Sequence, residues 1–341
     1  MADEESSRAS SKEARGDELA GVSAFAARIL NQLSLGAWLP AAFLTVCGSL
    51  LLEFRAQRSL NIAVAVSTLT RDRVRVLILT LPILIITTLV TQAFSFEAIR
   101  TLEGYWHRRG PASAMRSLMI RLQVRRKQSL IRRRARARAL AFATARPRLL
   151  AGKVPHAIVN ALEADALGTP APLLTALEQG RFEKMSWRSK CDSWRLARVD
   201  HLVLAERDYP ALSRVLPTRL GNVIRATEDR LRNAGQDIEG FALRRRDLVS
   251  SRVQQQHDQF RTPLDMYCIL VFVSAFLGGL TLVLLYGRSI NKRAVAAVAA
   301  AFALMTFASY QAAIASARGY CAALRQMDEV VTKDGRALRL P

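Results

Sequence analysis

Charged residues are absent from four apolar stretches of this 341-residue chain, and that absence sets its class. Each stretch is close to the ~20 residues that a helix needs to cross ~30 Å of hydrocarbon at ~1.5 Å per residue. An apolar segment of that length without Asp, Glu, Lys or Arg is typical of a transmembrane helix. The sequence therefore predicts a multi-pass membrane protein with four spans, Leu33–Leu52, Val76–Phe96, Met266–Tyr286 and Ala294–Ala317.

The chain also lacks the spacings that mark disulfide frameworks, metal sites and common enzymes. Its cysteines, Cys47, Cys191, Cys268 and Cys321, form no CxxC pair, so neither disulfides nor a zinc site is expected. The four histidines are scattered, and no GxSxG, HExxH or DxD motif occurs. The sequence predicts no cofactor, no metal and no catalytic residue.

Acidic residues are missing between Glu103 and Glu163, although arginine is abundant there. The chain carries 50 Lys+Arg against 28 Asp+Glu, a net charge of +22, and most of that excess lies in residues 97–265. A basic run near a membrane is attracted to anionic headgroups by about 1 kcal/mol per nearby cation. The residues predicted to contact anionic lipid or a polyanion are Arg121, Arg125, Arg126, Lys127, Arg132, Arg133, Arg134, Arg136 and Arg138.

Two alternatives remain open for this basic cluster. The first is a solvated or protein-contacting face, since charge runs often lie in water without a ligand. The second is electrostatic binding of a polyanion, with an affinity that falls steeply with salt. Nucleic acid is not the expected partner, because no aromatic interleaving or known nucleic-acid module accompanies the cluster.

Alternating β-patterns are absent, so the fold class is all-α, with two transmembrane hairpins flanking a basic helical domain. Residues 112–145 contain no Gly or Pro and predict one long basic helix. Weaker helical patterns follow. In one of them, 181–207, the spacing of Trp187, Cys191 and Trp194 indicates a single core-facing stripe. The other weak patterns are 155–166, 170–179 and 218–234.

The apolar stretches divide the chain into five parts. An even number of spans places both termini and the central region on one side of the membrane. The acidic first segment does not resemble a cleavable signal, and Cys191 has no evident partner, so that side is expected to be the cytoplasm. The parts are a disordered tail (1–27), the first hairpin (28–96), the basic cytoplasmic domain (97–265), the second hairpin (266–317) and a C-terminal tail (318–341).

Two junctions combine polar groups. Just before the third span, Pro263 is expected to interrupt the helix at the membrane surface. Earlier, Thr218 is placed to cap a helix in which Arg225 and Asp229 form an ion pair four residues apart. A phosphate site at the start of that helix is the weaker alternative. The membrane-surface ion-pair network is predicted at His257, Asp258, Arg261 and Asp265.

Three segments, 90–106, 217–230 and 257–268, together resemble a group of actinobacterial multi-pass membrane proteins. The similarity would cover most of the chain beyond the N-terminal tail. It implies a bacterial plasma membrane location and a shared architecture. No activity is established for that group, so the resemblance carries over no catalytic or binding residue.

These patterns predict a non-enzymatic integral membrane protein. Its basic helical domain would bind a partner or the anionic inner leaflet, in an anchor or assembly role. The alternative is a channel or transporter component formed by oligomerised transmembrane helices. Within one chain a pore is disfavoured, because ion pathways and proton relays usually need the ionisable groups that these spans lack. The expected partners are the lipid bilayer and anionic lipids, with a homo-oligomer or a protein partner also open.

Overall fold

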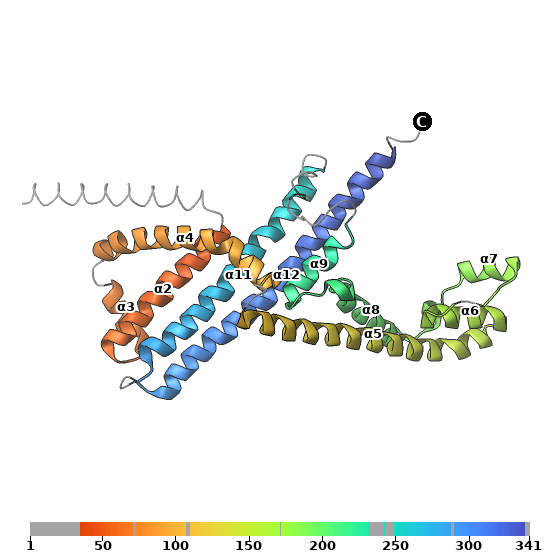
Figure 1. The fold of residues 1–341 in the computed structure, drawn as a ribbon, viewed down its shortest axis with the longest axis horizontal. Helices are drawn as coiled ribbons and strands as arrows, with labels where there is room; N and C mark the ends of the chain where they lie inside the picture. Colours follow the sequence, from red (N-terminus) through yellow and green to blue (C-terminus); the bar gives the residue numbers. More distant parts are fainter. Residues whose placement is uncertain are drawn as a thin grey trace, which may run out of the picture. The chain divides into compact units, whose positions relative to one another are not determined.

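The computed structural model describes ten α-helices, two short 3-10 helices and no β-strand within residues 35–70, 73–106, 110–170, 172–231, 240, 242, 249–287 and 290–337 (Figure 1). The all-α prediction is confirmed for these residues. The predicted tail at 1–27 lies outside them. The chain forms two compact units, Met1–Leu102 with Ala242–Pro341, and Glu103–Phe241. The predicted domain bounds stay a prediction, because compactness alone does not locate a membrane.

The first unit contains all four helices that are long and apolar enough to cross a membrane. Their apolar faces are largely open to the surroundings: Ile86, Leu89 and Phe94, for example, are each about 60 % exposed. Large apolar side chains at such exposure suit a lipid environment better than water. The unit's helices are α2 (Leu35–Gln57), α3 (Ile62–Thr70), α4 (Arg73–Glu103), α11 (Ser251–Leu285) and α12 (Lys292–Ala337).

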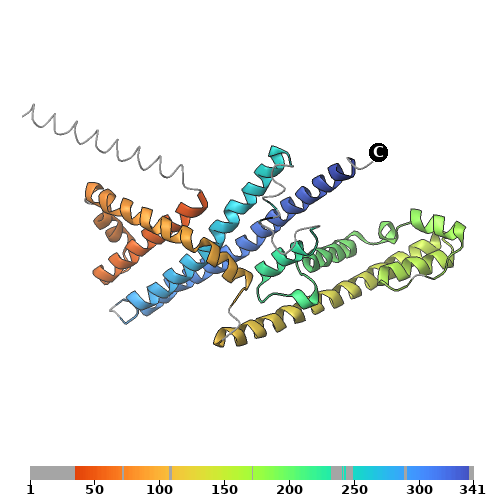
Figure 2. The same ribbon diagram turned by 45° about the horizontal axis from the view of Figure 1, so that its top comes forward.

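The two C-terminal helices, α11 and α12, pack against each other along their length (Figures 1 and 2). Small residues let the two backbones approach. A Cβ on Gly278 would lie 3.4 Å from the Phe302 Cβ, and one on Gly319 would lie 2.8 Å from Cγ of Phe260 and closer still to two other atoms of its ring. Close backbone approach is how helices associate where lipid removes the hydrophobic drive. Gly278 therefore lies in the contact between the two helices, whereas Gly279 faces open space.

Helix α2 packs mainly against α11, and contact of that extent with α4 is absent from the described residues. At its start, a Cβ on Gly36 would lie 3.0 Å from the carbonyl oxygen of Thr262. Further along, Leu51 and Phe54 are buried with Leu277 of α11 in one core cluster. The pairing of the first two spans into a hairpin thus remains a prediction, and the structure describes a three-helix packing of α2, α11 and α12 instead.

The expectation that Pro263 interrupts its helix is wrong, because α11 runs through it from Ser251 to Leu285. An internal proline removes one backbone hydrogen bond and costs about 3 kcal/mol in a helix. The segment around the proline is closely packed. Leu264 and Cys268, directly after the proline, are fully buried, and Gly36 of α2 lies against this turn.

Substituting Gly319 with leucine is expected to separate α11 and α12 around Phe260 and Gly319, because the new side chain would occupy the space of the Phe260 ring. Overpacking of this kind typically costs about 1–3 kcal/mol. Cross-linking of cysteines introduced on the two helices should fall in the variant, whereas Gly279→Leu, at an open position of α11, should leave it unchanged. Equal cross-linking in both variants would show that the close approach is not required.

The second unit contains one long helix, α5, and shorter helices that follow it in the sequence. Phe142 of α5 meets Trp187 edge-to-face at 6.1 Å, and Ile158 and Val199 complete the buried core around them. The predicted long basic helix is thus confirmed, with somewhat wider bounds. The helices are α5 (Pro111–Ala151), α6 (His156–Leu167), α7 (Ala176–Lys184), α8 (Ser193–Arg207) and α9 (Arg219–Glu228).

The prediction of a single helix over residues 181–207 is wrong. The backbone is extended at Ser186 and again at Cys191, so α7, a 3-10 turn at Trp187–Lys190 and α8 are separate elements. Consequently the expected stripe does not exist: Trp187 is buried and donates from Nε1 to Asp165 at 3.0 Å, whereas Trp194 is 58 % exposed. Tertiary contacts around Trp187 override the helical periodicity of the sequence.

Candidate functional site: the basic face of α5

Three of the nine cations predicted as lipid or polyanion contacts are engaged inside the second unit. Arg134 forms an ion pair with Glu206 at 2.8 Å, and Arg138 donates to the backbone carbonyl of Asp165 at 2.9 Å. Lys127 is buried, and its ammonium donates to the carbonyl of Pro210. These three side chains therefore fasten α5 to its neighbours.

Burial lowers the pKa of the Lys127 ammonium, and the nearby carboxylates of Glu206 and Asp229 oppose that shift. A buried amine that donates to a carbonyl has little freedom to reach a ligand in solution. Beside it, the Tyr209 hydroxyl lies 3.0 Å from Gln123 Oε1, which strengthens the same attachment. Lys127 is a structural residue of the α5 interface.

The other six predicted cations are exposed, and none has a carboxylate within ion-pair distance in the described part of the chain. Unpaired guanidinium groups keep their full charge and five donors for an external anion. Their binding of lipid or polyanion stays a prediction. They are Arg121, Arg125, Arg126, Arg132, Arg133 and Arg136.

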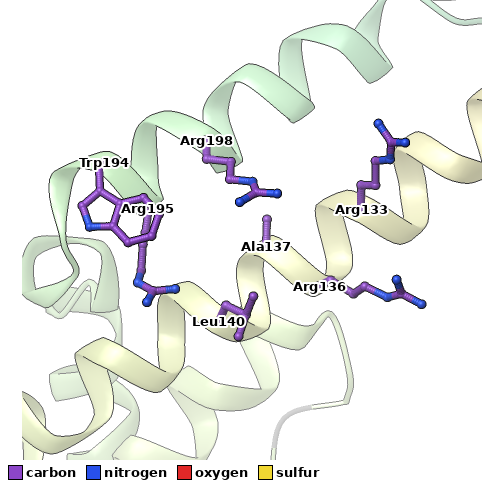
Figure 3. A pocket seen from close by; sticks show the side chains of 7 residues that line it. All are labelled: Arg133, Arg136, Ala137, Leu140, Trp194, Arg195 and Arg198. Atoms are coloured by element: carbon purple, nitrogen blue, oxygen red, sulfur yellow. The ribbon is translucent and has the colours of Figure 1, made fainter.

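Two of these arginines line a pocket of about 260 Å³ between α5 and α8 (Figure 3). Arg133 and Arg136 come from α5, and Arg195 and Arg198 extend from α8 across the gap toward α5. The remaining lining is apolar, with Ala137 and Leu140 on α5 and Trp194 on α8. The pocket thus joins four cations to an apolar floor, and no acidic residue lines it.

Two acidic residues near the pocket are paired with arginines outside it, and one of them, Asp192, also lies 3.7 Å from Nε of Arg195. Asp192 binds Arg148 at 2.7 Å, and Asp200 binds Arg188 at 2.6 Å. Within the pocket, the Arg195 guanidinium stacks over the Trp194 ring at 4.4 Å. A cation over an indole face is a favourable contact that fixes both side chains. Three of the pocket arginines, Arg133, Arg136 and Arg198, therefore have no carboxylate within ion-pair distance in the described residues.

The residues that α8 contributes to the pocket were not predicted from the sequence. Arg195 and Arg198 lie three residues apart and thus on one helix face, which was a readable signal. The signal was hidden because Trp194 was assigned to the core as part of the longer helix expected there. Only the break before α8 brings Trp194 and the two arginines to the surface opposite α5.

The start of helix α9 packs closely against the turn that follows α4. A Cβ on Gly221 would lie 2.8 Å from the carbonyl carbon of Glu103, and closer still to its oxygen. Nearby, Gly104 has φ +94°, and a Cβ there would lie 2.7 Å from Cδ of Pro217. The start of α9 is therefore filled by protein backbone, so the geometry does not support the weaker phosphate-site alternative.

Within this contact, the Asn222 side chain is fully buried and accepts from the Leu216 amide at 2.8 Å. Its own amide donates to the carbonyls of Leu216 and Thr218. The expected cap is confirmed, because Thr218 Oγ1 accepts from the Gly221 amide at 3.1 Å. We call the contact of residues 103–104 with residues 216–222 the α9 latch.

The expected Arg225–Asp229 pair differs from the observed one. Arg225 lies 3.4 Å from Glu228, and Asp229 pairs with Arg214 instead. Burial raises the pKa of Glu228, while Arg225 and Arg214 oppose that shift. Arg214 bridges both acids from a neighbouring segment, and this tertiary position explains why the local spacing alone selected the wrong partner.

The predicted network before the third span forms two local pairs on α11. His257 Nδ1 lies 3.0 Å from Asp258, and Arg261 Nε lies 3.3 Å from Asp265. Tyr320 of α12 joins them, because the His257 ring is 5.0 Å from its ring and the Arg261 guanidinium lies over it at 5.6 Å. The cluster links α11 to α12, while its place at a membrane surface stays a prediction.

No group of His, Cys, Asp and Glu side chains in the described residues could hold a metal ion. No family model matches the chain, and no curated protein or solved structure is significantly similar to it. The candidate function therefore depends on the geometry and charge of the α5 surface.

Proposed function

We propose that this chain is a non-enzymatic membrane protein whose basic helical domain, residues 97–265, holds to the anionic inner leaflet of a bacterial plasma membrane. It would serve there as an anchor or assembly element. The proposal includes a cytoplasmic domain bracketed by two transmembrane hairpins. The four apolar helices support a membrane location, and the direct packing of α11 on α12 supports the second hairpin.

One observation carries the proposal: the N-terminal half of α5 exposes apolar and cationic side chains together. Met115, Leu118 and Leu122 are 45–50 % exposed and share one face at spacings of three and four residues. Arg125 and Arg126 follow this stripe within one turn, without a carboxylate partner in the described residues. An apolar stripe bordered by arginine is typical of a helix that lies in the headgroup region of an anionic bilayer.

Chain connectivity supports the same role. Only seven residues separate the end of α4 at Glu103 from the start of α5 at Pro111. At no more than ~3.5 Å per residue, that connection keeps the start of α5 within ~30 Å of the end of a predicted span. The connection therefore allows the start of α5 to lie at the leaflet itself, which the proposal requires because the surface field decays over ~8 Å at physiological salt.

The test uses the full chain in nanodiscs and a tryptophan introduced by Leu118→Trp. Brominated lipids should quench the added fluorescence at least twofold more in phosphatidylglycerol than in phosphatidylcholine nanodiscs. The triple variant Arg121→Gln, Arg125→Gln, Arg126→Gln should lose that difference, because about 1 kcal/mol of lipid attraction is removed per cation.

The matched control removes three exposed cations elsewhere in the same unit, with Arg181→Gln, Lys184→Gln and Lys190→Gln. The control should retain the parent quenching, since the net charge changes equally but α5 does not. Equal quenching of the parent in the two lipids would rule out the leaflet role. It would leave a protein partner as the occupant of this face.

A further inference from the structure

We infer that the pocket between α5 and α8 is a binding site for a phosphomonoester carried on an apolar body. This inference does not depend on the proposed leaflet contact, because the pocket residues lie beyond the stripe at Met115–Leu122. Four arginines and an apolar floor define the site (Figure 3). The two proposals therefore fail through different substitutions.

The charge of the pocket points to a ligand with more than one negative charge. Arg133, Arg136 and Arg198 have no carboxylate within ion-pair distance among the described residues, and no acid lines the pocket. Like charges gathered around one opening repel each other, and a doubly charged anion relieves that repulsion. Guanidinium groups bind phosphate oxygens through paired, charge-assisted hydrogen bonds.

One donor at the wall is also unsatisfied. The Nε atom of Arg195 is buried and has no hydrogen-bond acceptor in the described structure. The nearest carboxylate oxygen, of Asp192, is 3.7 Å away, beyond hydrogen-bond range. A buried donor without a partner is costly, and an anion in the pocket supplies the missing acceptor.

The apolar floor selects what the phosphate is attached to. Leu140 and Trp194 are both more than half exposed, at 57 % and 58 %, although they adjoin the buried Ala137. Inorganic phosphate would leave these surfaces in water, whereas an acyl or aromatic group would cover them. Ligand pockets commonly combine such apolar walls with a few charged groups that fix orientation.

The backbone around the pocket is held in place before any ligand binds. The Arg134–Glu206 ion pair connects α5 to the C-terminal part of α8, and the Arg148–Asp192 ion pair connects α5 to the start of α8. Between these ties, Ala137, Ala141 and Val199 belong to one buried core. Sites on packed helices keep their geometry better than sites on loops, so little ordering of the backbone opposes binding.

The same chemistry could come from a lipid headgroup or from a soluble phosphate, and the experiment separates these sources. Isothermal titration of the full chain in maltoside micelles at low salt uses four probes. They are dihexanoyl phosphatidic acid, phenyl phosphate, inorganic phosphate and dihexanoyl phosphatidylcholine. We expect phosphatidic acid or phenyl phosphate to bind at least tenfold more tightly than inorganic phosphate, and the zwitterionic lipid to bind weakest. The tighter of the two identifies the source.

The deciding variant is Arg133→Gln with Arg198→Gln, which should weaken the tighter probe at least tenfold. The matched control, Arg181→Gln with Lys184→Gln, removes two exposed charges from α7 outside the pocket and should change the affinity less than threefold. Leu140→Gln should reduce the preference over inorganic phosphate without altering the affinity for inorganic phosphate itself. All these positions are exposed, and circular dichroism confirms that the helices persist.

Equal weakening in the two double variants would overturn the inference, because it would show attraction to net charge without a site. Failure of every probe to bind the parent protein at millimolar concentration would overturn it as well. Loss of the quenching difference in Arg121→Gln, Arg125→Gln, Arg126→Gln tests the leaflet proposal separately, since none of those residues lines the pocket.

Discussion

Replacing Gly221 with alanine is expected to destabilise the second unit by about 2–3 kcal/mol. The added Cβ would overlap the carbonyl of Glu103 in the α9 latch, and a backbone carbonyl cannot rotate away as a side chain can. Overpacking typically costs about 1–3 kcal/mol, and contact with fixed backbone belongs at the upper end. The ~1 kcal/mol gain in helix propensity from glycine to alanine offsets only part of that cost.

The matched control is Gly180→Ala on α7. Gly180 is also inside a helix, but a Cβ there meets nothing within 4 Å. The control should therefore stabilise the unit by about 0.5–1 kcal/mol. Thermal unfolding in micelles, followed by proteolysis within residues 103–241, measures both variants. A rise in melting temperature for both would show that α9 does not depend on close approach to Glu103.

Replacing Asn222 with alanine is expected to cost about 3 kcal/mol or more. The change leaves the amide and the carbonyl of Leu216 without partners, and Leu216 is only 5 % exposed. Each buried polar group left without a hydrogen bond costs about 1–3 kcal/mol. Thr218 loses less, because its carbonyl still accepts from the Asn222 backbone amide at 3.2 Å.

Asn222→Asp distinguishes the two halves of this arrangement. Aspartate can still accept from the Leu216 amide, but its carboxylate faces the carbonyls of Leu216 and Thr218 without a proton to donate. We expect this variant to be destabilised at neutral pH and to recover partly in acid, where the carboxyl group is protonated. Asn160→Ala, at an exposed position of α6, should stay within about 0.5 kcal/mol of the parent. If Asn222→Ala and Asn160→Ala had the same free energy of unfolding, the stabilising role assigned to the Asn222 side chain in the α9 latch would be wrong.

Local sequence patterns correctly predicted the helices and caps that depend on interactions between residues close together in the sequence. The charge-free stretches gave four helices that are long and apolar enough to span a membrane, and the run without Gly or Pro gave α5. The Thr218 cap followed from a hydroxyl placed just before a helix. In each case the determining interaction lies within a few residues of sequence.

The features that the sequence did not predict depend on contacts between distant segments. Pro263 lies within a helix because neighbouring helices hold it there, and Trp187 leaves the expected helix to bind Asp165. An arginine of α5 forms an ion pair only where an acidic residue of α8 lies beside it, as Glu206 lies beside Arg134. Spacing along one chain carries no information about such pairings until the register of the two helices is known.

The length of α12 has a mechanical consequence. At 46 residues it is ~70 Å long, more than twice the ~30 Å of a bilayer's hydrocarbon, and the part from Arg318 to Ala337 alone adds ~30 Å. With α11 packed beside it, this part is a stiff strut. Transmembrane helices adjust to bilayer thickness by tilting. With the span proposed at Ala294–Ala317, a strut of this length would turn a tilt of roughly 10° into a sideways displacement of about 5 Å at its tip, so the proposal predicts that a change in membrane thickness moves the C-terminal end of α12.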